Sequence, residues 1–115
     1  MVTINEATSF ALAFPEAVEL PHFENTSFRV KKKIFATLDK KKGTVVVKLS
    51  EVDQSVFSSG TKAIYPVSGG WGKQGWTIIE LKTVRKTLFK DALTTSYCTV
   101  APKKLASLIK HHDVD

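Results

Sequence analysis

The sequence predicts an α+β fold with two layers, in which helices pack on one face of a five-stranded antiparallel sheet in the order α-βββ-α-ββ-α-α. Segments with apolar residues at helical spacing lie at both ends of the chain and once in its middle. Between them, apolar and polar residues alternate, as in strands with one buried face. Short turns rich in lysine and glycine join several of these segments, and connections this short favour antiparallel pairing.

The first helix is expected from Thr3 to Phe14. Thr3 and Glu6 have the spacing of a capping box, and apolar residues recur every three or four positions after them. Pro15 ends this helix, because the residue before a proline disfavours helical geometry. Pro21 then indicates an extended segment before the first strand.

Three strands are expected next, over residues 26–30, 34–39 and 44–49. Lysine-rich turns at 31–33 and 40–43 join them as hairpins. In each strand alternate residues are apolar, so one face is expected to pack under the helices. The residues expected on that face are Phe28, Val30, Ile34, Ala36, Leu38, Val45, Val47 and Leu49.

A short helix is expected from the cap residue Ser50 to Gly60, which would end it in a left-handed conformation. Its apolar stripe consists of Val52, Val56 and Phe57. This stripe is expected to face the core.

Two more strands are expected over residues 63–67 and 76–81. Thr83 is expected to cap the longest helix, and Pro102 suits the first turn of a final one. Residues 111–115 have the composition of a polar tail. The apolar stripe of the longest helix is Leu88, Phe89, Ala92, Leu93, Tyr97 and Val100.

A chain of 115 residues fits a single domain over residues 1–115, which buries about 65% of its extended surface on folding. The lone Cys98 cannot form an internal disulfide, which favours a reducing compartment. No segment reaches the ~20 apolar residues that span a bilayer, and the first residues lack the pattern of a signal peptide. A cytoplasmic protein with no membrane partner is therefore expected.

The chain is basic, with 17 Lys plus Arg against 11 Asp plus Glu and a net charge of +6. A surface of this sign attracts polyanions without specificity. Fifteen of the 17 cations are lysines, which contact phosphates as point charges and read base edges less well than arginine does. Nucleic-acid contacts are therefore expected to be mainly to phosphate.

The enzyme motifs that occur in the sequence lack the context they need. Residues 70–75 match G-x-G-x-x-G, but a strand is expected after them, whereas a dinucleotide-binding fingerprint opens a helix. Cys98 falls in a helix beside apolar residues, where cysteine is usually a small core residue. His22, His111 and His112 are too few and too isolated for a structural metal site. No enzymatic activity, cofactor or metal is therefore expected.

Four passages, PHFENTSFRV, KKIFATL, VKLS and GGWGKQGWT, occur in this order at residues 21–30, 32–38, 47–50 and 69–77. With these passages the chain resembles the MmcQ/YjbR family over nearly its whole length. The resemblance implies a compact fold of the type III secretion-chaperone-like class, and a predicted DNA-binding role with a double-wing motif. It implies no catalytic residue, and Gly75 stands where many family members have a histidine.

One functional hypothesis is a weak, sequence-nonspecific DNA-binding module. Lysines in hairpin turns supply phosphate contacts, and a tryptophan in the glycine-rich stretch is able to stack on a base if the strand is single. Solvated hairpin ends that keep strand edges from aggregating explain the same lysines without a ligand. The candidate residues are Lys31, Lys32, Lys33, Lys40, Lys41, Lys42, Trp71 and Lys73.

A second hypothesis is a protein-interaction or self-association module. If the inward residues pack under the helices, strand alternation directs Phe35, Val46, Trp76 and Ile78 to the opposite face, which a two-layer fold leaves open. Four apolar side chains on such a face are typical of an interface, with a partner protein or in a weak homodimer. The alternative is that a terminal helix or a loop of the same chain covers them.

Overall fold

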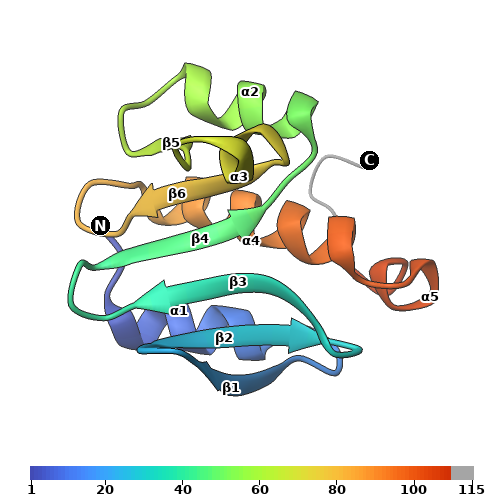
Figure 1. Ribbon diagram of the computed structural model, residues 1–115. Coiled ribbons are helices and arrows are strands. Elements are labelled where there is room, and N and C mark those ends of the chain that lie inside the picture. Colours follow the sequence, from blue (N-terminus) through green and yellow to red (C-terminus); the bar gives the residue numbers. More distant parts are fainter. Residues whose placement is uncertain (110–115) are drawn as a thin grey trace.

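The computed structural model describes residues 1–109, which form one six-stranded sheet and five helices (Figure 1). The strands are β1 (Val18–His22), β2 (Asn25–Val30), β3 (Lys33–Asp39), β4 (Thr44–Lys48), β5 (Ile64–Pro66) and β6 (Trp76–Glu80). The helices are α1 (Ile4–Leu12), α2 (Glu51–Ser59), α3 (Gly70–Lys73), α4 (Lys86–Val100) and α5 (Lys103–Ala106).

The strand order in the sheet is β1-β2-β3-β4-β6-β5, and every neighbouring pair is antiparallel. The predicted α+β class with an antiparallel sheet is confirmed, but the sheet has six strands where five were predicted. The additional strand is β1, which contains Pro21 and was expected only to be extended. Because β1 is an edge strand with β2 as its single neighbour, the missing N–H of Pro21 breaks no central ladder.

One face of the sheet carries the core. Helices α1 and α4 lie behind the sheet in Figure 1, and α4 crosses β3 and β4. Val45 and Val47 of β4 are buried under these helices, and α4 contributes Phe89, Leu93 and Tyr97. We call the opposite face, which is turned toward the viewer in Figure 1, the outer face.

A β-bulge interrupts the alternation of β3. Arg29 pairs with Ile34 and Phe28 pairs with Ala36, so Phe35 is an extra residue with no partner on β2. After this bulge two consecutive residues, Phe35 and Ala36, are both fully buried. Ile34 does not pack against the core and takes the position on the outer face.

The predicted outward position of Phe35 is therefore wrong, and so is the predicted inward position of Ile34. The Phe35 ring meets Tyr97 edge-on at 5.4 Å and Phe14 edge-on at 5.9 Å between ring centroids. Phe14 and Tyr97 stack at 4.7 Å, and the Tyr97 hydroxyl donates to the Pro15 carbonyl at 2.7 Å. Phe35 thus belongs to an aromatic cluster in the core and not to an interaction surface.

The glycine-rich stretch folds into the short helix α3 and then enters β6. Gly75 has a φ of +103°, and a Cβ at this position would lie 1.8 Å from the Leu49 carbonyl oxygen. A Cβ on Gly72 would lie 1.8 Å from the Val67 carbonyl oxygen. Both glycines are therefore required for a close backbone approach, which fixes α3 beside the sheet.

Two of the predicted helix caps are present. The Thr3 hydroxyl accepts from the Glu6 N–H and the Glu6 carboxylate accepts from the Thr3 N–H, each at 3.0 Å. The Ser50 hydroxyl accepts from the Asp53 N–H at 3.1 Å. The three bonds satisfy N–H groups at the helix N-termini.

Three details of the predicted helices are wrong. Gly60 follows α2 with a φ of −101°, which is not left-handed. Arg85 precedes α4 in place of Thr83, because the chain forms a turn after β6 before the helix begins. Val52 and Val56 are exposed, since α2 lies at the sheet edge beside β5 and presents only part of its surface to the domain.

None of the helices within residues 1–109 has the length and apolar character needed to cross a membrane. The predicted polar tail over 111–115, which includes His111 and His112, lies outside the described residues.

Candidate functional site

Two hairpin turns lie together at one end of the sheet. The β1–β2 turn consists of Phe23 and Glu24, and the β3–β4 turn covers residues 40–43. Because β2 and β3 are antiparallel, β2 begins at the end of the sheet where β3 stops. The two turns border a surface hollow of about 610 Å³, which we call the tip hollow. Its lining is Phe23, Glu24, Asn25, Asp39, Lys40, Lys41 and Lys42.

The backbone of the lysine turn is held by one side chain. A carboxylate oxygen of Asp39 accepts from the Lys41 and Lys42 N–H groups, each at 3.0 Å. Gly43 has a φ of +68° and donates its N–H to the Asp39 carbonyl at 2.9 Å. Lys40, Lys41 and Lys42 are exposed, and none of the three forms an ion pair within residues 1–109. The turn therefore presents three ammonium groups on an ordered backbone.

The β1–β2 turn presents an aromatic ring to solvent. Phe23 is 95% exposed and has a φ of +58°, in the left-handed region. Its ring meets the His22 ring edge-on, with 4.8 Å between centroids. The sequence patterns did not indicate Phe23 as a site residue, because without β1 there is no β1–β2 turn in which to place it.

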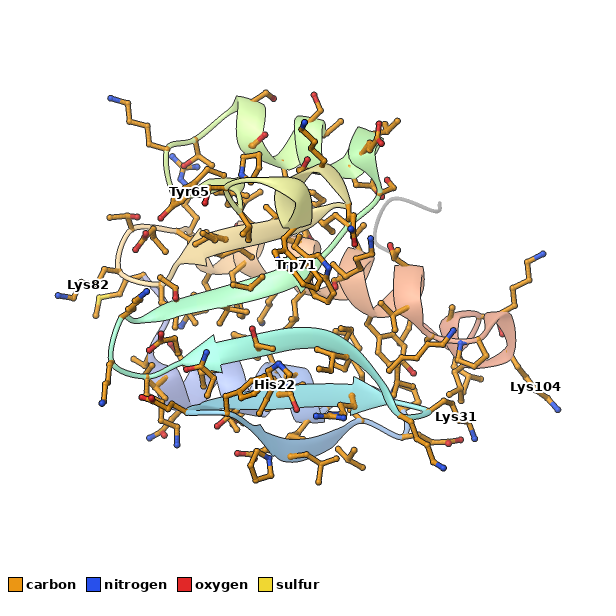
Figure 2. The ribbon with its side chains drawn as sticks, viewed as in Figure 1. His22, Lys31, Tyr65, Trp71, Lys82 and Lys104 are labelled. Carbon is orange, nitrogen blue, oxygen red and sulfur yellow. The ribbon has the colours of Figure 1, made fainter. Side chains whose placement is uncertain are left out.

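The second lysine turn, at 31–33, lies at the opposite end of β3, and Lys31 lies on the right in Figure 2. Lys31 and Lys32 have positive φ values of 50° and 71°. Lys31 forms an ion pair with Glu16 at 2.8 Å, so this turn is partly neutralised. The two predicted lysine turns therefore form separate patches, and the turn beside Phe23 has more free charge.

The other two candidate nucleic-acid residues lie away from the tip hollow. Trp71, which is 64% exposed, and Lys73 are on α3, which contacts β6. β6 begins at Trp76, which pairs with Lys48 at the end of β4, so α3 lies toward the end of the sheet where β3 begins. Trp71 and Lys73 are thus on the side of the 31–33 turn.

Val46, Trp76 and Ile78 are half-buried and do not pack against the core. Val46 pairs with Ile78 across the centre of the outer face, and Tyr65 of β5 pairs with Ile78 from the other side. The Lys48 ammonium lies 5.8 Å from the centre of the Trp76 ring. The outer face therefore combines apolar groups with a lysine that partly screens one of them.

Polar side chains border this apolar centre. The Tyr65 hydroxyl donates to the Glu80 carboxylate, and this bond raises the pKa of Tyr65 above its ordinary value. A shallow hollow of about 490 Å³ includes both residues together with Val46 and Ile78. The outer face therefore offers both apolar and polar contacts to a partner.

Burial or an ion pair shifts the pKa of two other side chains, Cys98 and Glu6. Burial raises the pKa of the Cys98 thiol, which favours the neutral form over a nucleophilic thiolate. Lys86 binds the Glu6 carboxylate at 2.6 Å, and this bond lowers the pKa of Glu6 to about 2. Lys90 lies 4.5 Å from the centre of the Phe10 ring. Within residues 1–109, no three His, Cys, Asp or Glu side chains are grouped so that they could hold a metal ion.

The YjbR family model matches residues 12–99 of this chain. The chain belongs to the YjbR family. In this YjbR-family chain the matched region contains all six strands and both lysine turns, and it ends within α4. The family description names no activity.

A solved structure has the same fold. It is the crystal structure of Deinococcus radiodurans protein DR2400, described as a DUF419 domain, with a TM-score of 0.74 and 22% sequence identity. The match covers 87% of this chain and 79% of that chain. No curated protein matches the sequence. At this identity the likeness shows the fold alone.

Proposed function

We propose that this YjbR-family protein is a DNA-binding module that binds weakly and without sequence preference. The observation that carries the proposal is the turn at 40–43, where three exposed ammonium groups stand on a backbone ordered by Asp39 and form no ion pair within residues 1–109. Ordered, unpaired lysines at a protruding turn contact phosphates without a large loss of backbone entropy. The double-wing DNA-binding role that the family resemblance implies agrees with two neighbouring hairpin turns.

The expected affinity is low because lysines contribute positive charge but do not recognise particular bases. Non-specific binding at physiological salt has dissociation constants of about 10⁻⁴ to 10⁻⁶ M. The turn at 31–33 is a second contact, about 23 Å from the first, because β3 joins the two turns and has seven residues at ~3.3 Å each. A duplex needs about seven base pairs, at ~3.4 Å each, to reach both turns. Neither contact involves a catalytic step or a cofactor.

The test is a fluorescence titration of random duplex DNA of about 18 base pairs at low salt. The variant Lys40→Gln/Lys41→Gln/Lys42→Gln should bind at least about tenfold more weakly than wild type. The matched control is Lys62→Gln/Lys103→Gln/Lys104→Gln, which removes three exposed lysines that do not line the tip hollow. An equal loss in both variants would mean that only net charge matters. Absence of wild-type binding at about 50 μM protein would end the proposal.

A second candidate function is self-association or binding of a partner protein through the outer face. It is favoured by Val46, Trp76 and Ile78, which lie on the face that α1 and α4 do not cover. Burying about 600 Å² of apolar surface per partner would offset much of the cost of association, so a dimer of micromolar affinity is expected.

The proposed location is the cytoplasm. A single cysteine that is partly buried and protonated needs no oxidising compartment.

A further inference from the structure

Phe23 is in a conformation that its residue type disfavours. Its φ of +58° is in the left-handed region, where bulky residues are uncommon and where glycine or asparagine would fit the turn better. Phe23 is 95% exposed and does not belong to the hydrophobic core. Neither the turn nor the core therefore gains stability from a phenylalanine here, and a strained, exposed aromatic residue is typical of a binding site.

The surroundings of Phe23 indicate the chemistry of the ligand. The tip hollow, an open surface hollow of about 610 Å³, joins the Phe23 ring to Lys40, Lys41 and Lys42. Asp39 and Glu24 also line the hollow, but Asp39 is engaged by two backbone N–H groups. An aromatic ring beside several ammonium groups suits a ligand in which flat apolar rings alternate with anions.

We propose that Phe23 is a base-stacking group and that the tip hollow binds single-stranded nucleic acid, with a base on the Phe23 ring and the adjoining phosphates at Lys40, Lys41 and Lys42. This inference rests on the proposed DNA binding and adds a preference for single strands. In a duplex the faces of each base are covered by its neighbours, whereas a single strand leaves them free to stack on a side chain. The His22 ring lies edge-on to the Phe23 ring, with 4.8 Å between centroids.

The experiment compares fluorescence anisotropy of a labelled oligothymidine of about 12 nucleotides with that of a 12-base-pair duplex. Wild type should bind the single strand several-fold more tightly. Phe23→Ala should weaken single-strand binding by about 5- to 150-fold, the range measured for the loss of one stacked base, and should change duplex binding less than about twofold. Phe23→Trp should retain the preference. Trp71→Ala is the matched control, because it removes another exposed aromatic ring that lies away from the tip hollow.

Thermal unfolding separates binding from folding. Phe23→Gly should unfold at the same temperature as wild type or at a higher one, because glycine relieves the positive φ, while it loses the single-strand preference. A Phe23→Gly variant that unfolds at the wild-type temperature and still prefers single strands would overturn the assignment.

Four outcomes would contradict the inference. Equal wild-type affinity for both nucleic acids with no effect of Phe23→Ala would overturn the stacking role and leave the proposed DNA binding intact. A loss of the preference in Trp71→Ala alone would move the stacking group to α3. Competition by polyglutamate as strong as that by oligothymidine would show that charge alone is recognised. If neither nucleic acid binds, the proposed function fails and this inference fails with it.

Discussion

Replacing Phe35 with alanine is expected to destabilise the domain by about 4 kcal/mol, the middle of the range for a buried phenylalanine. Phe35 is fully buried and makes edge-on contacts with Phe14 and Tyr97, so truncation leaves a cavity lined by two aromatic rings. A domain of this size is stable by roughly 5 to 15 kcal/mol, so the loss is a large part of the total.

The informative comparison is with Ile34, the residue before Phe35. Without the bulge, Ile34 would point to the core and Phe35 to the outer face. With the bulge, Ile34 is half-buried outside the core, and Ile34→Ala should cost only about 1 kcal/mol.

Urea unfolding followed by tryptophan fluorescence measures both variants. With a slope near 1.3 kcal/mol per molar urea, the Phe35→Ala midpoint should fall by about 3 M and the Ile34→Ala midpoint by less than about 1 M. Equal slopes in wild type and variants are the control for a common unfolded state. A larger loss for Ile34→Ala than for Phe35→Ala would refute the bulge and the reassignment of both side chains.

Three further predictions follow from the outer face and the first helix. Trp76→Ala should lower the free energy of unfolding by about 2 kcal/mol because a half-buried ring is lost. Trp71→Ala should lower it by less than about 1 kcal/mol because that ring is exposed. Equal urea midpoints for the two variants would contradict this prediction. Val46→Lys should convert a dimer into a folded monomer in sedimentation over a wide concentration range, and a wild type that stays monomeric would end the self-association proposal. Lys86 lowers the pKa of Glu6 from 4.5 to about 2, so the ionised Glu6 carboxylate stabilises the fold fully above about pH 4.5, and this stabilisation is lost as the pH falls toward 2. Glu6→Gln should therefore reduce the pH dependence of the thermal unfolding midpoint between pH 4.5 and 2. A variant with the same pH dependence as wild type would argue against the ion pair.

Local signals in the sequence were sufficient for most of the fold. The caps at Thr3 and Ser50 depend on residues three positions away, and the inward side of β4 follows from strict alternation. These features need no knowledge of distant partners. The features that could not be predicted depend on how strands pair: the bulge at Phe35 exists only in the pairing of β3 with β2, and β1 is tolerable with Pro21 only because it is an edge strand.

In the candidate site, too, some features follow from local sequence and others depend on how the strands pair. The exposed lysines at 40–42 were predictable because lysine triplets between alternating segments indicate a hairpin turn. Phe23 could not be predicted as a site residue, because its exposure and positive φ result from the two-residue turn between β1 and β2. The separation of Trp71 from Lys41 also depends on the sheet order, which no local pattern encodes.

The most direct test of the proposed nucleic-acid binding is the salt dependence of duplex affinity between about 50 and 200 mM salt. Each phosphate contact contributes about −0.9 to the slope of log K against log salt concentration. Wild type should show a steep negative slope. The slope for Lys40→Gln/Lys41→Gln/Lys42→Gln should be shallower by about 2 to 3. The slope for Lys62→Gln/Lys103→Gln/Lys104→Gln should stay close to that of wild type. An affinity that does not change with salt, or a slope that the Lys40–Lys42 substitutions leave unaltered, would contradict phosphate binding by this turn.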